Sequence, residues 1–289
     1  MSSSNTGNQR QSKVAVITGS SSGIGRATAL RLAADGYSVV LHGLRNVAGV
    51  QATATEILER TGRTSLCVLA DVADSRSRLD LVRAAFQWQG RVDAWINNAG
   101  ADVLTTEARH WSFEAKLEHL LATDLVSTAS LSREVADRMR QQATEPSVSN
   151  PASPPDARPC IINIGWDQAL IGMSGDSGQL FCATKAAIMA FTNSFAMTVA
   201  PHIRVNCVAP GWIKTAWGDG QDSNDYWDAR ARGESLLARW GSPEDIASTI
   251  AWLVSPHAAF INGQCINING GRRFTAPAPT DWVAGSKQS

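Results

Sequence analysis

The sequence has no excess of charge of either sign, because 26 lysines and arginines balance 26 aspartates and glutamates among 289 residues. It also contains no long basic run. Binding to a nucleic-acid backbone or to an anionic membrane normally depends on a concentration of positive charge. The composition therefore argues against nucleic acid or membrane as the main partner and favours a small neutral or carrier-borne substrate.

Metal-ligand spacing and long apolar runs are also missing. The five cysteines are scattered and are expected to be reduced and mostly buried, with no metal bound. No apolar run approaches the roughly 20 residues needed to cross a bilayer. The polar residues 1–12 lack the apolar stretch of a secretory signal, so we expect a disordered tail there and a cytoplasmic protein.

Short β-branched runs alternate with helical patterns along nearly the whole chain. This alternation predicts an α/β fold, a doubly wound parallel sheet of about seven strands in a single domain over residues 13–271. The expected strands cover 14–18, 38–42, 64–69, 92–96, 161–164, 203–208 and 264–268. The expected helices cover 25–35, 48–61, a stretch ending at 89, 113–142, 181–200 and 244–254.

Three segments interrupt the alternation or follow it. Residues 143–159 are rich in Pro, Ser and Ala, which predicts a surface loop or a partly disordered insertion. Residues 212–240 carry four tryptophans and are interpreted as a lid over a pocket, with ordinary surface packing of aromatic side chains as the alternative. The tail 272–289 either crosses to a neighbouring subunit or is frayed.

A glycine-rich turn separates the first strand from the first helix. It reads Thr18-Gly19-Ser20-Ser21-Ser22-Gly23-Ile24-Gly25. Glycines permit a tight turn and let the backbone approach a pyrophosphate, while the helix N-terminus offers free N–H groups and a positive dipole end. An ordinary strand-to-helix turn is the alternative. The placement favours a dinucleotide site in a Rossmann fold, with Gly19, Ser21, Ser22, Gly23, Ile24 and Gly25 at the cofactor.

Four further motifs follow in a fixed order, and together with the turn they resemble the short-chain dehydrogenase/reductase family over residues 13–271. The motifs are Asp71-Val72, Asn97-Asn98-Ala99-Gly100, Lys185 and Pro210-Gly211. The resemblance implies that Asp71 and Val72 flank the adenine of the cofactor. It places Asn98, Ala99, Gly100 and Lys185 along the cofactor, and Pro210, Gly211, Ile213 and Thr215 at its nicotinamide end.

The end of the second strand indicates which cofactor is preferred. An NAD site usually has a carboxylate there for the adenosine ribose, but the sequence Leu41-His42-Gly43-Leu44-Arg45 has none. Arg45, helped by Arg26, could instead pair with a 2′-phosphate. We therefore predict NADP(H) rather than NAD(H), with a solvated Arg45 as the alternative.

The catalytic positions depart from the family pattern. Phe181 stands four residues before Lys185, where the family has a proton-donating tyrosine. Asp124 replaces the family's asparagine, and the serine position is Trp166 or, counted back from Phe181, Gln168. The two tyrosines do not fill the gap, because Tyr37 precedes the second strand and Tyr226 lies in the lid.

Loss of a general acid typically lowers a rate by about 10²–10⁴. Water or Asp167 could supply the proton instead, because a carboxyl beside an indole such as that of Trp166 can have a raised pKa. A solvated loop aspartate is the alternative. Ser174 and Ser177, further along this loop, could replace the serine only if the loop folds unusually, and Asp176 and Gln179 are interpreted as stabilising the loop.

Three functions remain open at this point. The first is an NADP(H)-dependent oxidoreductase similar to 3-oxoacyl-acyl-carrier-protein reductases, acting on a small molecule or an acyl thioester through a remodelled site. The second is an NADP(H)-binding protein without redox turnover, a sensor or partner subunit. The third is a non-redox enzyme that uses Asp167 or Lys185 with the cofactor as a scaffold. The resemblance also implies a homodimer or homotetramer formed through helices 113–142 and 181–200.

Overall fold

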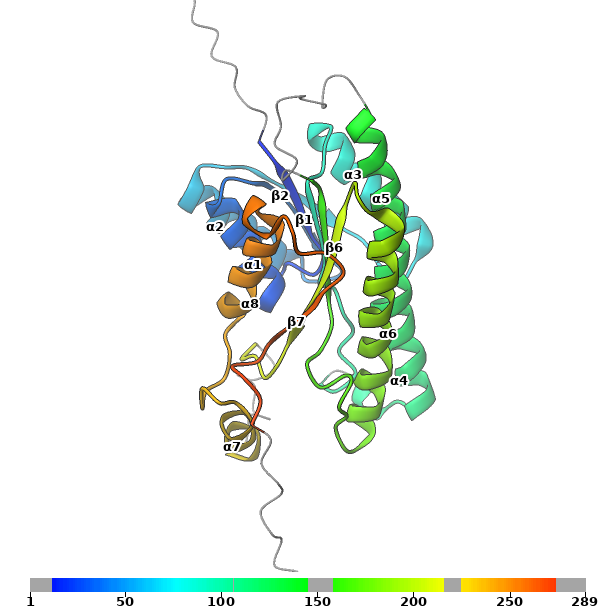
Figure 1. Cartoon of the computed structure of the whole chain (residues 1–289), viewed down its shortest axis with the longest axis vertical. Helices are drawn as coiled ribbons and strands as arrows, with labels where there is room; N and C mark the ends of the chain where they lie inside the picture. Colours follow the sequence, from blue (N-terminus) through cyan, green and yellow to red (C-terminus); the bar gives the residue numbers. More distant parts are fainter. Residues whose placement is uncertain (1–11, 106, 145–157, 216–224, 274–289) are drawn as a thin grey trace, which may run out of the picture.

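The computed structural model describes residues 12–105, 107–144, 158–215 and 225–273. Its centre is a seven-stranded parallel sheet in the order β3-β2-β1-β4-β5-β6-β7, with helices on both faces (Figure 1). The strands are β1 (Val14–Ile17), β2 (Ser38–Gly43), β3 (Ser65–Leu69), β4 (Ala94–Asn97), β5 (Cys160–Ile164), β6 (Arg204–Pro210) and β7 (Cys265–Ile268). The predicted doubly wound Rossmann fold is confirmed.

Helices cover the two faces of the sheet because its strands alternate between two apolar surfaces. The helices are α1 (Gly23–Ala34), α2 (Val47–Thr61), α3 (Ser75–Gln89), α4 (Phe113–Leu120), α5 (Ser127–Thr144), α6 (Asp176–Val199), α7 (Asp225–Glu234) and α8 (Pro243–Val254). Ala15 and Ile17 of β1 pack with residues of α1, α2 and α8. Val14 and Val16 pack with residues of α3, α5 and α6 on the other face.

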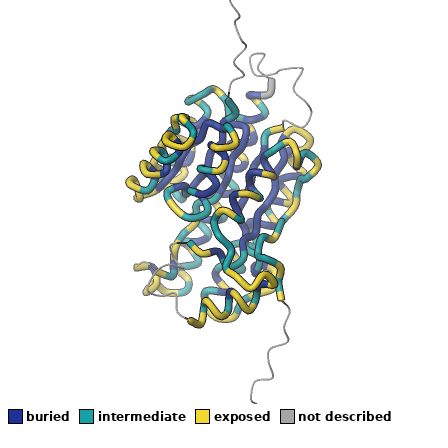
Figure 2. The backbone as a smooth tube through the Cα atoms, turned by 90° about the vertical axis from the view of Figure 1, so that its left-hand side faces the viewer, coloured by how far each residue is buried: buried dark blue, intermediate teal, exposed yellow. Residues whose placement is uncertain are grey.

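The central strands are buried along their whole length, as expected for a parallel sheet covered on both sides. Every residue of β1, β4, β5 and β6 is buried, whereas β3 at the edge alternates between intermediate and exposed positions. Figure 2 shows these buried segments in the interior, with the exposed positions on the outer faces of the helices. The short continuous apolar runs of the sequence therefore form the interior of the sheet.

The predicted helix 113–142 is not uniform. Between α4 and α5 lies η2 (Leu121–Val126), a stretch of π-helix. Such local widenings of a helix are frequently found at functional sites. Here the widened turn contains Asp124, whose side chain is turned inward and is only 2% exposed.

α6 begins at Asp176, five residues before the predicted start at Phe181. Among the described helices, α6 is by length and composition long and apolar enough to cross a membrane, which the sequence analysis did not anticipate. It packs against β6, and its Phe195 and Val199 lie in the core cluster beneath the sheet. This position is that of a core helix.

A buried amide network connects β4 and β5 with the helices beneath them. Asn97 and Asn163 are register partners, and Asn97 Nδ2 donates to Asn163 Oδ1 at 2.8 Å. Asn163 Nδ2 donates to Thr192 Oγ1 at 2.9 Å, and Asn97 Nδ2 also donates to Ser132 Oγ at 3.0 Å. Trp95 Nε1 donates to Asn97 Oδ1 at 2.8 Å. Both amides therefore have partners although they lie in the core.

The predicted tails and loops fall mostly outside the described residues. These include residues 1–11, most of the 143–159 insertion, residues 216–224 of the lid with Trp217, and the tail after residue 273. The described part of the lid is tied to the chain that follows β7. Leu236 N donates to Gly271 O at 3.0 Å, and Arg273 N donates to Glu234 O at 2.8 Å.

Candidate functional site

The turn between β1 and α1 requires its glycines. Gly19 and Gly23 have φ angles of +66° and +53°, a region that other L-residues rarely adopt. A Cβ on Gly25 would lie 2.2 Å from the carbonyl oxygen of Gly19. The three glycines of the predicted motif are therefore needed for this backbone path.

Helix α1 begins without a side-chain cap. Ser22 is at the N-cap position, but its hydroxyl makes no hydrogen bond to the first turn, which also contains no acidic residue. By contrast, side chains cap α2, α3, α4 and α8. The first N–H groups of α1 are thus available to an external anion, which is the property that suits a helix N-terminus to a pyrophosphate.

Asn98 at the end of β4 fixes the glycine turn. Its Nδ2 donates to the carbonyl oxygens of Thr18 at 2.9 Å and Gly19 at 3.0 Å. The backbone N–H groups of Asn98 and Ala99 both donate to Thr18 Oγ1 at 2.9 Å. Because both amide protons of Asn98 are used in this way, its side chain positions the turn along which a cofactor would lie.

His42 is a further residue at this site, and the sequence analysis gave it no role. Gly19 N donates to His42 Nδ1 at 3.1 Å, and His42 Nε2 lies 3.0 Å from the carbonyl oxygen of Ala70. Burial lowers the pKa of His42, which favours a neutral ring that accepts at Nδ1 and donates at Nε2. The only signal in the sequence was a polar residue at the end of an apolar strand.

The residues predicted at the adenosine end of the track differ in their exposure. Asp71 is exposed, and its Oδ1 accepts a hydrogen bond from Ala73 N at 2.8 Å, whereas Val72 is buried. Arg45 is exposed just beyond β2. Arg26 is paired with Glu56 of α2, so it is not free to assist Arg45 as the sequence analysis suggested.

The nicotinamide end of the track returns to the glycine turn. Pro210 ends β6, and Gly211 N donates to Ile268 O at 3.0 Å. Ile213 forms a parallel bridge with Gly241. The methyl group of Thr215 lies 3.5 Å from the position that a Cβ on Gly23 would occupy. The nicotinamide end of the predicted cofactor track therefore lies beside the glycine turn at the start of α1.

Lys185 and Asp124 form a buried ion pair. Lys185 Nζ lies 2.8 Å from Asp124 Oδ2, with side-chain exposures of 14% and 2%. Asp124 Oδ1 accepts a hydrogen bond from Ala101 N at 2.8 Å, and Lys185 Nζ lies 3.5 Å from the carbonyl oxygen of Ile164. Gly100 is packed against the same carboxylate, since a Cβ there would lie 3.0 Å from Asp124 Oδ2. The lysine charge is thus balanced inside the protein.

Phe181 and Trp166, the latter one of the two residues predicted at the family's serine position, have their rings in contact. The ring centroids are 6.3 Å apart and the planes meet at 73°, an edge-to-face contact. Neither ring offers a hydroxyl group. The two rings therefore form an aromatic contact that carries no hydroxyl group.

Asp167, next to Trp166, has a buried carboxylate at the end of β5. Its side chain is 5% exposed, its Oδ2 accepts from Asn269 Nδ2 at 3.0 Å, and Arg272 Nη1 is 3.9 Å away. Its Oδ1 has no hydrogen-bond partner among the described residues. Burial raises the pKa of Asp167 despite these two neighbours. A Cβ on Gly211 would lie 3.4 Å from Asp167 Oδ2, so the carboxylate borders the nicotinamide end of the track.

Of the other candidates, Gln168 is buried, and its Nε2 lies 3.4 Å from Glu234 Oε2. Tyr37 is buried in the core, where burial raises its pKa to about 12, and Tyr226 is 60% exposed on α7. Ser174, Asp176 and Gln179 are exposed near the start of α6. Neither tyrosine therefore forms a described contact with the Lys185–Asp124 ion pair.

The described part of the lid is a packed aromatic unit. The Trp212 ring lies 5.5 Å from the ring of Trp227 and 6.1 Å from that of Trp240. The Arg230 guanidinium lies 5.3 Å from the Trp212 ring, and Trp212 Nε1 donates to Glu234 Oε2 at 2.8 Å. These contacts fasten α7 to the chain that leaves β6 at the nicotinamide end.

Comparison with known proteins agrees with this geometry. A family model described as "Enoyl-(Acyl carrier protein) reductase" matches residues 19–273. A 3-oxoacyl-[acyl-carrier-protein] reductase of Synechocystis is 32% identical over 265 residues, which cover 90% of this chain and 96% of that protein. The first description names the reduction of an enoyl group, and the second names the reduction of a 3-oxo group.

Two solved structures are also similar. A short-chain dehydrogenase of Burkholderia cenocepacia in complex with NADP is 28% identical, with a TM-score of 0.73 over 91% of this chain and 98% of that one. The acetoin dehydrogenase of Salmonella typhimurium is 28% identical, with a TM-score of 0.75 over 92% and 98% of the two chains. Both the sequence and the fold thus point to the same group of proteins.

Proposed function

The chain belongs to the short-chain dehydrogenase/reductase family, and from this we propose that it is an NADP(H)-dependent oxidoreductase with a remodelled proton donor. Its substrate would be a carbonyl or hydroxyl group on a small molecule or an acyl thioester. The cofactor supplies or accepts the hydride when it is bound. The protein's own contribution is to hold the cofactor and the substrate together and to move one proton.

The observation that carries this proposal is the uncapped start of α1, with Asn98 behind it and Thr215 beside it. A helix that leaves its first N–H groups free, at a turn where glycine is required, suits a pyrophosphate. Arg45, exposed beyond β2 with no carboxylate at the strand end, favours the 2′-phosphate of NADP(H). The NADP complex of the Burkholderia relative is consistent with this preference.

We assign the proton donor to Asp167. Its raised pKa favours the protonated form that a general acid requires, and it borders Gly211 at the nicotinamide end. In the reductive direction Asp167 would give its proton to the substrate's carbonyl oxygen, which leaves Asp167 as a carboxylate and the substrate as an alcohol. Asp167 then takes a proton from water. In the reverse direction its carboxylate accepts the proton of the hydroxyl group.

Binding without turnover is the second candidate function. It is favoured by the Trp166–Phe181 contact, which places two apolar rings where hydroxyl groups are expected, and by the pairing of Lys185 with Asp124. A sensor or a partner subunit would need the cofactor track but no proton donor.

We further propose a cytoplasmic homodimer or homotetramer that associates through α5 and α6.

The test is to titrate the protein with NADPH and NADH, and then to follow NADPH oxidation with a panel of ketones and acyl thioesters. Tight NADPH binding with oxidation by one substrate class supports the reductase. Binding without any oxidation favours the sensor. If neither NADPH nor NADH binds, both the reductase and the sensor are contradicted.

Asp167→Asn tests the proton donor. Asp176→Asn is the matched control, because Asp176 is an exposed aspartate at the first position of α6, where the loop that contains Asp167 ends. We expect the first change to lower turnover by about 10²-fold or more with little effect on NADPH affinity. The control should behave like the parent protein. Equal turnover in both variants would remove Asp167 from the proposal.

A further inference from the structure

An arginine occupies a core position on α3. Arg78, Leu81, Val82 and Ala85 follow helical spacing and form the buried face of this helix. Arg78 is 9% exposed, so its charge is almost fully removed from water. Burial of a charge is costly unless the charge is paired and hydrogen-bonded. The groups around this guanidinium therefore need an explanation.

The described partners of Arg78 are neutral. Its Nη1 donates to the carbonyl oxygens of Val72 at 2.6 Å and Ala73 at 3.0 Å. No carboxylate of the described residues forms a salt bridge with it. Asp74, one turn earlier, uses its carboxylate to cap α3, where Oδ2 accepts from Ser77 N at 2.7 Å. Besides the hydrogen bond from Ser77, the positive charge of Arg78 helps to lower the pKa of Asp74, but no described carboxylate forms a salt bridge with Arg78.

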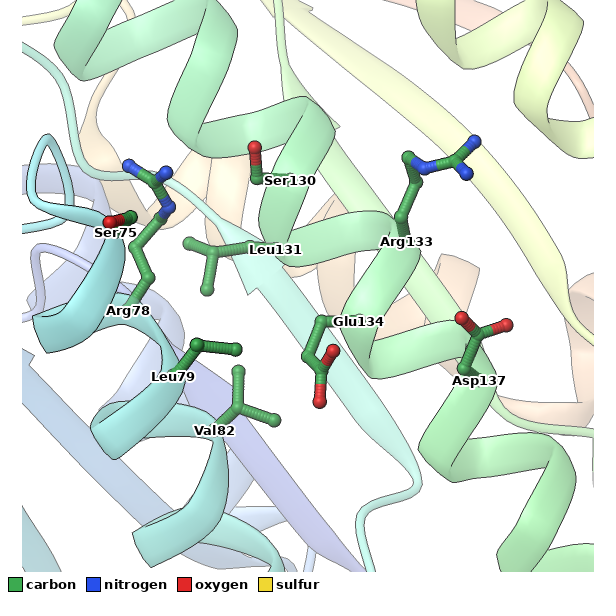
Figure 3. Close-up of a pocket in the computed structure, with 9 residues that line it drawn as sticks. All are labelled: Ser75, Arg78, Leu79, Val82, Ser130, Leu131, Arg133, Glu134 and Asp137. Atoms are coloured by element: carbon green, nitrogen blue, oxygen red, sulfur yellow. The ribbon is translucent and has the colours of Figure 1, made fainter.

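Arg78 lines a cavity of about 360 Å³ between α3 and α5. In Figure 3, Arg78 and Ser75 come from α3, and Ser130 and Leu131 come from α5 on the opposite side. The Arg78 guanidinium lies at the same end of the cavity as the two serine hydroxyls. This end offers three groups that can donate hydrogen bonds to one ligand.

The two acidic residues of the cavity are already paired with arginines. Glu134 Oε1 accepts from Arg138 Nε at 2.9 Å, and Asp137 Oδ1 accepts from Arg140 Nη1 at 3.4 Å. Both acids lie at the other end of the cavity from the Arg78 guanidinium (Figure 3). The end with Ser75 and Ser130 therefore holds the Arg78 guanidinium and neither of the two acids that line the cavity.

We propose that this cavity binds a small oxyanion, a phosphate or a carboxylate, on Arg78 with Ser75 and Ser130. A guanidinium matches the geometry of either group, and a buried one binds it more strongly than an exposed one. The same guanidinium holds the carbonyls of Val72 and Ala73, next to Asp71 at the predicted adenine site. Resting on the proposed function, this link makes the oxyanion a regulator of NADPH affinity.

The first experiment is calorimetric titration with inorganic phosphate, and separately with acetate, at constant ionic strength set with chloride. The parent protein is compared with Arg78→Gln and with Arg76→Gln, a control that removes an exposed charge from the same helix. We expect saturable binding to the parent and the control, and at least about tenfold weaker binding to Arg78→Gln. Binding of phosphate alone would indicate a site for a phosphate group, and binding of both anions would indicate a site that also accepts a carboxylate.

Ser130→Leu is the second variant, because it fills the cavity without removing a core charge. It should also abolish binding, which keeps the test decisive if Arg78→Gln does not fold. No saturable binding of either anion to the parent overturns the proposal. Equal binding to the Ser130→Leu variant overturns it as well, since the anion would then lie elsewhere, for example at the uncapped start of α1.

The regulatory link is tested by NADPH titration with and without the anion that binds. We expect the anion to change NADPH affinity in the parent and in Arg76→Gln, and to change it less in Arg78→Gln. If NADPH does not bind at all, the proposed function fails while the phosphate titration still decides the oxyanion site. An identical effect of the anion in all three proteins would refute the link.

Discussion

Lys185→Met should destabilise the protein much more than Asp124→Asn, although both changes break the same ion pair. The reason is the unequal burial of the two partners. Asp124 is 2% exposed and Lys185 is 14% exposed. Without the lysine, the carboxylate keeps the hydrogen bond from Ala101 N at 2.8 Å and no cation among the described residues. A buried charge left in this way costs about 3–5 kcal/mol of unfolding free energy.

Asp124→Asn leaves the lysine in a better position. The ammonium group is closer to solvent and remains 3.5 Å from the carbonyl oxygen of Ile164. The asparagine retains an oxygen that can accept from Ala101 N. We therefore expect a loss of about 1–3 kcal/mol, close to the cost of leaving one polar group poorly satisfied. The double variant should lose little more than this, so the coupling should be nearly as large as the cost of Lys185→Met alone, about 3–5 kcal/mol.

The assay is urea unfolding at neutral pH, followed by circular dichroism, for the parent, both single variants and the double variant. The surface pair of Arg83 and Asp80 is the control cycle, because its atoms are also 2.8 Å apart but both side chains are 56% exposed. Its coupling should be below about 1 kcal/mol. Equal losses in the two single variants at Lys185 and Asp124, or additivity within about 0.5 kcal/mol, would refute the reasoning.

Three other predictions concern the site. Phe181→Tyr should raise turnover, by no more than the roughly 10²–10⁴ that a general acid contributes, and an unchanged rate would indicate that the Trp166 ring closes the position. Gly25→Ala should weaken NADPH binding and lower the melting temperature, since its Cβ would lie 2.2 Å from Gly19 O; unaltered binding would contradict the required turn. Because the pKa of Asp167 is raised by burial, its stabilising contribution is present below the ordinary pKa of an aspartate and lost as pH rises through the raised value. In denaturant titrations, the stability of Asp167→Asn relative to the parent should therefore increase as the pH is raised from acidic to neutral. A relative stability that decreases over the same range would refute the raised pKa.

Local sequence patterns predicted most of the fold because they follow directly from burial. The run Val14–Ile17 is apolar at every position, as a strand covered on both faces must be, and it forms β1. The start of α6 was missed because Asp176 and the next few residues are polar and include a glycine, which hides a helical pattern. The π-helical turn at Leu121–Val126 depends on packing and has no local signal.

The sequence predicts a set of site residues, but it does not predict the contacts among them. The loss of the tyrosine hydroxyl at Phe181 is visible in the sequence, whereas its ring contact with Trp166 depends on the path of a long loop. The pairing of Asp124 with Lys185 joins residues far apart in the chain, so only the folded structure brings the two charges together. His42 and the pairing of Arg26 with Glu56 were missed for the same reason.

The amides of Asn97 and Asn163 have a consequence for how the sheet is assembled. They lie opposite each other in the β4–β5 register and share a hydrogen bond of 2.8 Å in the core. A shift of β5 by one residue would turn the Asn163 amide to the other face of the sheet and separate the pair. Asn163 would then lose Asn97 and Thr192 as partners, and its unsatisfied amide would cost about 1–3 kcal/mol, whereas Asn97 would keep its bonds to Trp95 and Ser132. The Asn97–Asn163 hydrogen bond thus favours one register of β4 and β5. That register fixes where β5 ends and therefore where the following segment, with Trp166 and Asp167, begins.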